Sequence, residues 1–496
     1  MMAASSMGPG PSQILSQTES VCPECLARLP ARRVQSGEDV YLEKTCPQHG
    51  AFSTIIWRGL PSFSSWARPK TPSFPQNPFT ESRQGCPYDC GLCPQHRQQS
   101  CCVLLEVTQR CDLHCPVCFA DAGHNPAPDL TLSEIAAWYE RLLAAGGPFN
   151  IQLSGGEPCV RDDLPEIIRL GRSYGFTFFQ LNTNGLRLAQ EHAPHGASGA
   201  KWGAAYLAEL KDAGLSTVFL QFDGTDDTIY KRIRGRELLE KKMAVIQRCA
   251  ELEIGVVLVP TLIPGINTAD IGTILRLALA HMPAVRGVHF QPVSYFGRYD
   301  GNPSNDARMT LPEVIRAIET QSDGLISAGS LCPPGGENAQ CSFHGNYVLM
   351  PDGALKALTR HKTESCCSQP IQAAQGAARS REFVAGHWSS PALPQAASGI
   401  NSAADLPVLS APSLGGWDVF LERKRTHTFC VSGMAFQDSW TLDLERLRDC
   451  YIHTASPDGR LVPFCAYNLT DRQGRSLYRQ SHDQEYQGLL RENHAA

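Results

Sequence analysis

The cysteines of this 496-residue chain are the feature that most restricts how it can fold. There are 20 of them, and they occur in short groups along the sequence. Small secreted proteins that depend on disulfides reach about 8–10% cysteine, well above the share in this chain. The first residues also lack the basic and apolar stretches of a secretory signal, so we expect a cytoplasmic protein with reduced thiols. Grouped, reduced cysteines favour metal or iron–sulfur ligation over disulfide bonding.

The overall composition excludes several classes of protein. Hydrophobic residues make up 42% of the chain and charged residues 19%, so it can bury a large core. The net charge of −5 argues against a nucleic-acid-binding protein, which needs a basic excess on its binding face. No run of about 18 apolar residues occurs, so the sequence predicts no transmembrane segment.

Cysteine-rich segments flank a central region that has a different pattern. We expect a flexible tail over residues 1–20, a cysteine-rich metal-binding domain over 21–101 and a further metal-binding region over 326–496. Long periodic segments are scarce over 21–101, so bound metal should hold that domain together. Residues 368–416 are rich in Ala, Ser, Pro, Gly and Gln, and this composition predicts a disordered insertion.

The central region, residues 102–325, alternates apolar segments of strand length with amphipathic helical segments. This alternation predicts a parallel sheet with helical crossovers, either an open doubly wound sheet or a partial barrel. In both architectures, ligands bind at the carboxyl ends of the strands. The expected strands are 103–109, 149–155, 176–185, 216–224, 255–263 and 286–297.

Two groups of three cysteines share the spacing Cys-x3-Cys-x2-Cys. The first triplet is Cys86, Cys90 and Cys93, and the second triplet is Cys111, Cys115 and Cys118. Three thiolates so close together suit a cubane iron–sulfur cluster, and they leave one iron free to bind another ligand. The alternative is a zinc knuckle completed by a distant fourth ligand.

The second triplet directly follows the first expected strand. The second strand ends in Gly155, Gly156, Glu157 and Pro158, so both groups should lie at the same edge of the sheet. Two glycines would let the backbone approach a ligand closely, and a glutamate can bind an ammonium group.

These motifs resemble those of the radical S-adenosylmethionine (SAM) superfamily. CDLHCPVC corresponds to its cluster motif and SGGEP to the motif that contacts the methionine amine. The resemblance implies an α/β fold, a partial (β/α)6 radical SAM barrel with a [4Fe–4S] cluster on the second triplet. The open iron would bind the amino and carboxylate groups of SAM. One departure is Val117, since the family usually has an aromatic residue there, and Phe119 follows directly. The first triplet would then hold an auxiliary cluster.

Polar residues at the later strand ends fit the same interpretation. Asn182 and Asn184 end the third strand and resemble the ribose-contacting stretch of the superfamily. Gln221 and Asp223 end the fourth strand, and Gln291 ends the sixth, where the adenine edge is commonly bound. The resemblance implies that these residues bind the cofactor.

The remaining grouped cysteines predict further metal sites. Near the N-terminus, three cysteines form a knuckle whose fourth ligand is His49 or an unplaced cysteine, and zinc and rubredoxin-like iron both suit it. These three ligands are Cys22, Cys25 and Cys46. Four cysteines in the last region would hold a second auxiliary cluster. Cys101–Cys102 and Cys366–Cys367 are adjacent pairs, and one member of each would be an extra ligand. These four are Cys332, Cys341, Cys450 and Cys465.

The full set of motifs resembles one family within this superfamily. CPEC, CPQHG, CPYDCGLCPQH, CDLHCPVCFADAG and CYIHTASPDGRLVPFCAYNLT are similar to the tetraether lipid synthase-like proteins, also described as dihydro-hydroxymethylpterin methyltransferases. The resemblance implies carbon–carbon bond formation on lipid chains as the main expectation. The alternative it implies is methylation of a pterin, 7,8-dihydro-6-hydroxymethylpterin.

The resemblance also implies partners and a mechanism. A low-potential donor of the ferredoxin or flavodoxin type would reduce the cluster, and cleavage of SAM would give a 5′-deoxyadenosyl radical that abstracts hydrogen from an unactivated carbon. A lipid substrate would need either a long apolar tunnel or a surface that contacts the bilayer, in which case the protein would lie at the inner face of the membrane. Two other classes stay open, a non-catalytic zinc-stabilised binding protein and a multi-cluster electron carrier. Neither class explains the motifs at the strand ends.

Overall fold

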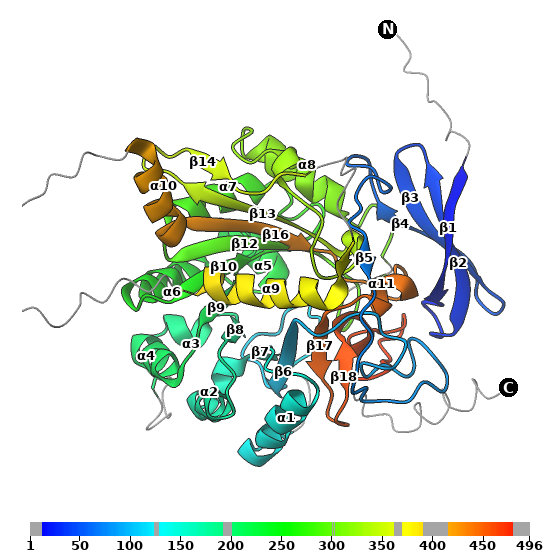
Figure 1. Ribbon diagram of the computed structural model, residues 1–496, viewed down its shortest axis with the longest axis horizontal. Helices are drawn as coiled ribbons and strands as arrows, with labels where there is room; N and C mark the ends of the chain where they lie inside the picture. Colours follow the sequence, from blue (N-terminus) through cyan, green and yellow to red (C-terminus); the bar gives the residue numbers. More distant parts are fainter. Residues whose placement is uncertain are drawn as a thin grey trace, which may run out of the picture.

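The computed structural model describes residues 12–123, 128–191, 201–299, 301, 303–361, 370–389 and 415–479. Its centre is a sheet in which six parallel strands lie side by side in chain order (Figure 1). These strands match the six expected from the sequence. They are β6 (Cys102–Thr108), β7 (Asn150–Gly155), β8 (Phe179–Thr183), β9 (Thr217–Gln221), β10 (Gly255–Val259) and β12 (Val285–Pro292).

Helices connect these strands and cover the outer face of the sheet, as the alternation predicted (Figure 1). The first begins at a capping box in which Thr131 and Glu134 satisfy each other's backbone N–H groups. The partial (β/α)6 barrel is therefore confirmed. Its helices are α1 (Leu132–Ala144), α2 (Leu164–Ser173), α3 (Leu186–Ala189), α4 (Gly203–Ala213), α5 (Asp227–Arg234), α6 (Leu239–Glu251), α7 (Ile271–Ala280) and α8 (Leu311–Gln321).

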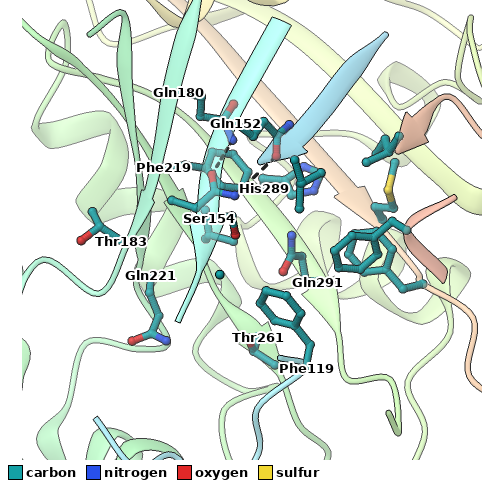
Figure 2. Close-up of a pocket in the computed structure, with 18 of the residues that line it drawn as sticks. Phe119, Gln152, Ser154, Gln180, Thr183, Phe219, Gln221, Thr261, His289 and Gln291 are labelled. Atoms are coloured by element: carbon teal, nitrogen blue, oxygen red, sulfur yellow. Dashed lines mark hydrogen bonds between the residues drawn. The ribbon is translucent and has the colours of Figure 1, made fainter. Parts of the chain in front are cut away.

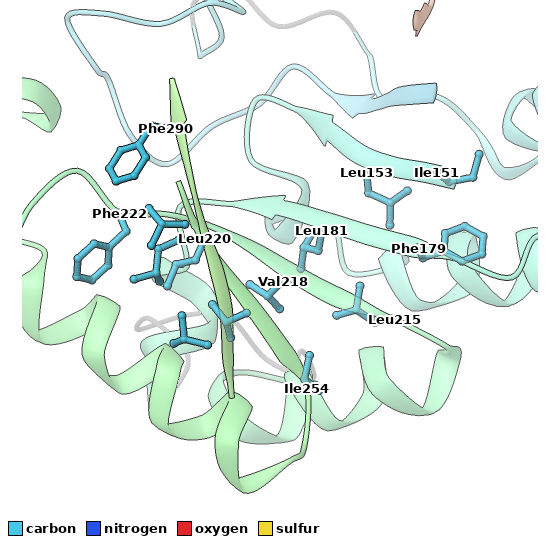
Figure 3. Packing of buried hydrophobic residues seen from close by; sticks show 14 of the residues in the cluster. Ile151, Leu153, Phe179, Leu181, Leu215, Val218, Leu220, Phe222, Ile254 and Phe290 are labelled. Carbon is cyan, nitrogen blue, oxygen red and sulfur yellow. The ribbon is translucent and has the colours of Figure 1, made fainter. Parts of the chain in front are cut away.

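The two faces of the parallel sheet differ in chemistry. Ile151, Leu153 and Leu181 point outward and pack under the helices in the main hydrophobic core (Figure 3). Because successive strand residues face opposite sides, the residues between them point into the barrel. These inward residues include Gln152 and Gln180, so polar side chains line part of the barrel interior.

Strands from the C-terminal region extend the same sheet at both edges. β16 (Thr428–Met434) pairs in parallel with β12, and β17 (Ile452–Ala455) pairs in parallel with β6. The region expected over 326–496 is therefore built into the barrel wall. The remaining strands of this sheet are β11 (Thr261–Leu262), β13 (Ser342–Leu349), β14 (Leu355–Ala357) and β18 (Leu461–Pro463).

The expected disordered insertion contains a well-packed helix. α9 (Ala373–Trp388) crosses the amino-terminal ends of β10 and β12, where Arg286 Nε donates to the His387 carbonyl at 2.9 Å. A Cβ atom on Gly255 would overlap the Trp388 carbonyl oxygen. The prediction was wrong here because an Ala- and Gln-rich composition suits a helix as well as a linker. Residues 368–369 and 390–414 of that insertion lie outside the described residues, and α10 (Gly415–Thr426) begins within its last two positions.

The N-terminal domain is a four-stranded antiparallel sheet. Its first strand starts inside the segment expected to be a flexible tail, of which residues 1–11 lie outside the described part of the chain. Its strands are β1 (Gln13–Val21), β2 (Arg28–Ser36), β3 (Asp39–Cys46) and β4 (Gly50–Trp57). Shorter elements complete the fold: β5 (Lys70–Thr71) with β15 (Ile371–Gln372), α11 (Leu444–Arg448), α12 (Phe464–Tyr467), and 3₁₀ turns at Pro158–Val160, Ala328–Ser330 and Ala339–Cys341. Among the described residues, no helix is both long enough and apolar enough to cross a bilayer.

Candidate active site

A cavity of about 300 Å³ lies inside the barrel. The second triplet lines it together with Gly155, Gly156 and Glu157, so the structure brings together the two motifs on which the sequence interpretation depended. The cavity continues along the inner face of the sheet toward the amino-terminal ends of the strands. There it reaches Trp388 on α9 and Tyr451 beside β17.

Gly155, the last residue of β7, and Gly156 allow the backbone there to pack closely against the segment after β6. The N–H groups of Gly156 and Glu157 donate to the carbonyls of Thr108 and Arg110 at 2.8 and 2.9 Å. A Cβ atom on Gly156 would overlap the Arg110 carbonyl oxygen. The glycines were expected to admit a ligand, but they primarily seat the loop that leads into Cys111.

Glu157 fastens the ends of β7 and β8 together. One carboxylate oxygen accepts from Cys159 N at 2.9 Å and Thr183 Oγ1 at 2.7 Å, and the other accepts from Asn184 N at 2.7 Å. Burial raises the pKa of Glu157 to about 7, and the nearby Asp112 adds to this shift. The expected ammonium contact would have to share a carboxylate that already accepts three hydrogen bonds.

A buried ion pair lies beside the second triplet and was missed by the sequence interpretation. Arg234 lines the cavity, and its guanidinium binds both oxygens of Asp223 at 2.7 and 2.9 Å. Burial alone would lower the pKa of Arg234, but the Asp223 carboxylate and a hydrogen bond to Cys115 outweigh it and raise that pKa. The arrangement holds a positive charge where an anionic ligand group can reach it.

The other predicted cofactor-binding residues divide into two groups. Asn182, Gln221 and Gln291 line the cavity, and so does Asn184, whose Nδ2 donates to Asp112 Oδ1 at 2.6 Å in the cluster loop. Two predicted residues are buried behind the wall and support it. These are Pro158, in the 3₁₀ turn after Glu157, and Asp223, behind Arg234.

The residues around the second triplet fit a [4Fe–4S] cluster and SAM. Burial raises the pKa of the Cys111 thiol to about 12, so the proton leaves only when a metal takes its place. Beside the thiols the cavity offers the guanidinium of Arg234 and the amides of Asn182 and Gln291. A zwitterionic amino acid that carries a nucleoside matches this mixture of charge and amides.

The N-terminal knuckle forms a compact site for one ion. Cys22, Cys25, Cys46 and His49 place their ligand atoms within 4.8 Å of one another, which identifies His49 as the fourth member. Hydrogen bonds from the Gln48 backbone and from His49 outweigh burial and lower the pKa of Cys46 to about 7. Among the described residues no other set of three such groups is so close. Cluster ligands bind different irons, so their sulfurs need a wider separation.

The first triplet surrounds a small cavity of its own. Cys86, Cys90 and Cys93 line a space of about 10 Å³ together with His96. The hydroxyl of Tyr478 holds this loop, because it accepts from Cys90 N at 2.9 Å. The three cysteines therefore line one small space, and that they hold a cluster stays a prediction.

Three of the four C-terminal cysteines lie close enough to affect one another. Burial raises the pKa of Cys450, and the sulfurs of Cys465 and Cys341 add to that shift. Cys332 has other neighbours: its S–H lies 3.9 Å from the Ser330 carbonyl, and Arg68 is the charged group near it. Cys102 is instead near Cys450, and it lines the main cavity.

The inward positions of the strands carry polar residues that sequence reasoning did not select. Gln152, Ser154, Gln180 and His289 line the cavity before the strand ends (Figure 2). Their signal was present in the sequence as polar residues at every second strand position.

Comparisons with known proteins agree with this architecture. A family model of the radical SAM superfamily matches residues 105–278, and one of the HMPTM N-terminal zinc ribbon domain matches residues 14–58. The crystal structure of Streptococcus suis SuiB bound to precursor peptide SuiA aligns with a TM-score of 0.36 and 12% identity, covering 46% of each chain.

Two relatives extend the comparison to other parts of the chain. The probable GTP 3′,8-cyclase of Archaeoglobus fulgidus is 25% identical over 275 residues, 52% of this chain and 86% of that protein. The 7,8-dihydro-6-hydroxymethylpterin dimethyltransferase of Methanocaldococcus jannaschii is 33% identical over 489 residues, 92% of this chain and 94% of that protein. The chain is therefore a radical SAM enzyme and belongs to the family of this archaeal dimethyltransferase.

Proposed function

We propose that this enzyme methylates a pterin, 7,8-dihydro-6-hydroxymethylpterin, at carbon, with SAM as the source of the methyl groups. The observation that carries the proposal is the 33% identity to the archaeal dimethyltransferase over nearly the full length of both chains. The alternative reading of the sequence thus receives support, whereas none of the relatives described above supports the main expectation of lipid coupling.

The size of the cavity and the amides in its wall support a compact substrate that carries polar groups. Its volume of about 300 Å³ is at the lower end for small-molecule sites. Its walls carry a row of amides, and a hydrocarbon chain would leave the unpartnered Oε1 of Gln180 without a hydrogen-bond donor. A bicyclic heteroaromatic ring with N–H and C=O groups can pair with such walls.

The chain's own residues hold and shield the reactants. The second triplet would hold the cluster, and Arg234 would attract the carboxylate of SAM. SAM bound at such a cluster would supply the means to remove hydrogen from an unactivated carbon, and a second SAM molecule would supply the methyl group. The barrel wall and α9 exclude water from the cavity, which protects reactive species from competing reactions.

We assign the other thiols to supporting metal centres. The first triplet would hold one auxiliary cluster, and Cys341, Cys450 and Cys465 a second, with Cys102 in place of Cys332 as the fourth ligand. The knuckle at Cys22 would hold one ion, and the zinc ribbon match favours zinc over iron. A low-potential protein of the ferredoxin or flavodoxin type would supply electrons.

The proposal is tested by a methylation assay. The enzyme, reconstituted without oxygen, is given SAM, dithionite and 7,8-dihydro-6-hydroxymethylpterin, and pterins are measured by mass spectrometry. We expect products heavier by one and two methyl groups. Cys115→Ala should abolish them, because it removes a cluster ligand, whereas Cys249→Ala, in a buried thiol on α6, should keep them.

An intact enzyme that forms 5′-deoxyadenosine but no methylated pterin would overturn the substrate assignment and leave the radical SAM chemistry in place. Linked or branched lipids formed in a parallel incubation with lipid substrates would restore the lipid interpretation.

A further inference from the structure

The deep half of the cavity contains a continuous row of amides. Gln180 Nε2 donates to Asn182 Oδ1 at 2.7 Å, and Asn182 Nδ2 donates to Gln152 Oε1 at 3.4 Å. Gln152 Nε2 in turn donates to Cys102 Sγ at 3.3 Å. Every amide in the row donates in the same direction, so the row begins at a carbonyl oxygen, Gln180 Oε1.

That oxygen has no partner within the described part of the chain. Gln180 is only 1% exposed, and its Oε1 is buried without a hydrogen-bond donor. A buried acceptor without a donor costs the free energy of removing its oxygen from water, and a ligand that donates a hydrogen bond to it recovers part of that cost. The residue lies on the cavity wall, so a bound molecule can supply the missing N–H.

Aromatic rings form the adjacent wall. Phe219 stacks on Trp388 of α9 with ring centroids 5.5 Å apart and planes 22° apart. His289 lies 5.5 Å from Phe219 and 6.5 Å from Trp388, so the three rings form one cluster. His289 also shares a hydrogen bond with Ser432 Oγ at 2.8 Å, which fixes its ring. Figure 2 shows Gln152, Gln180, Phe219 and His289 at one end of the cavity, and Gln221, Thr261 and Phe119 at the other.

We propose that Gln180 is the specificity residue for the 2-amino group of the pterin, with the ring packed against Phe219 and His289. This inference rests on the proposed function and assigns where its substrate binds. The amino group donates to Gln180 Oε1 and completes the amide row. Aromatic faces are the preferred surroundings for a flat heteroaromatic ring.

The same orientation places the reacting end of the substrate correctly. Gln180 lies two residues before Asn182 on β8, a distance of about 6.6 Å toward the amino-terminal end of the strand. A pterin that turns its aminopyrimidine ring to Gln180 directs its opposite ring to the strand ends. That opposite ring carries the C7 methylene and the 6-hydroxymethyl group, and it faces the second triplet.

The test compares two fluorescent probes, 6-hydroxymethylpterin and 6-hydroxymethyllumazine, which has a carbonyl in place of the 2-amino group. Each is titrated without oxygen into the reconstituted full-length enzyme, and its Kd is measured from fluorescence. We expect the wild type to bind the pterin at least about 10-fold more tightly, because a carbonyl would face the Gln180 oxygen. Gln180→Leu should bring the ratio of the two Kd values close to 1.

The matched control is Gln247→Leu on α6, a glutamine that is exposed and bonded to Glu251 at 3.0 Å, and it should keep the wild-type ratio. A wild type that binds both probes equally, or a Gln180→Leu enzyme that keeps the preference, overturns the inference while the proposed function stands. A wild type that binds neither probe overturns the proposed function as well. Because the wild-type ratio is informative alone, the test does not depend on folding of the variant.

Discussion

At the scale of single residues, the site depends on side chains that hold other side chains in place. Asp223 was predicted to bind the cofactor, but it is buried behind Arg234 and holds that guanidinium beside Cys115. Glu157 has a similar role between two strand ends. Strand-end position identified both residues, and only the three-dimensional structure shows that they act through their neighbours.

Asp223→Asn should therefore destabilise the enzyme strongly. Both partners of the Asp223–Arg234 pair are nearly inaccessible, with side-chain exposures of 0% and 6%, so the variant leaves a buried guanidinium without its counter-charge. Loss of one partner of such a pair costs about 3–5 kcal/mol. Chemical denaturation would measure this change, and calorimetry should show weaker SAM binding because Arg234 is no longer held in position.

Glu166→Gln is the matched control for this variant. Glu166 pairs with Arg169 at 3.0 Å on the surface of α2, and both side chains are 46% exposed. Exposed pairs contribute about 0–1 kcal/mol, so we expect little change in stability or SAM binding. Equal effects of the two substitutions would show that the buried pair has no special role.

At the scale of elements, hydrophobic pattern predicted the parallel strands well. β7 is an example: Ile151 and Leu153 face the core, and the polar residues that alternate with them, Gln152 and Ser154, face the cavity. The pattern could not show that β16 and β17 join the two edges of the sheet, since their partners β12 and β6 are far away in sequence. It also could not distinguish α9 from a linker, because tertiary contacts such as those to Gly255 and Arg286 order that segment.

β17 and its neighbours also bring a set of cysteines beside the cavity, and this leads to a prediction about iron. Cys450 precedes β17 and lies near Cys341, Cys465 and Cys102. Cys450→Ala should remove up to about four irons and as many sulfides per chain, since a cubane needs its thiolates. Cys332→Ala should leave both contents unchanged, because the structure places Cys332 near Arg68 instead. Loss of iron and sulfide in Cys332→Ala, with unchanged contents in Cys450→Ala, would restore Cys332 as the ligand.

At the scale of the whole molecule, the C-terminal segment connects the N-terminal sheet to the barrel. Arg33 Nε donates to Asp443 Oδ2 at 2.7 Å, and Lys44 Nζ donates to the carbonyls of Ser439 and Trp440 at 2.7 and 2.9 Å. These partners belong to the same segment that carries Cys450 and Cys465. Cys46 of the metal knuckle is the last residue of β3, and Lys44 of the same strand contacts the C-terminal segment. A metal bound at the knuckle would therefore stabilise the strand on which the auxiliary-cluster region packs.

The N-terminal sheet should accordingly depend on its metal, whereas the barrel should not. The metal knuckle has a small cluster of buried apolar residues, and small domains of this kind draw folding energy from a bound ion. Cys46→Ala should lower the zinc content by about one ion per chain, because it removes one of four ligands. Hydrogen exchange should then speed up across β1–β4, while β7 and β8, which pack in the main core, keep their protection.

Thr45→Ala, at the exposed neighbouring position, serves as the control and should change neither the zinc content nor the exchange rates. Unchanged exchange in β1–β4 after loss of the ion would mean that packing against the C-terminal segment alone folds this sheet.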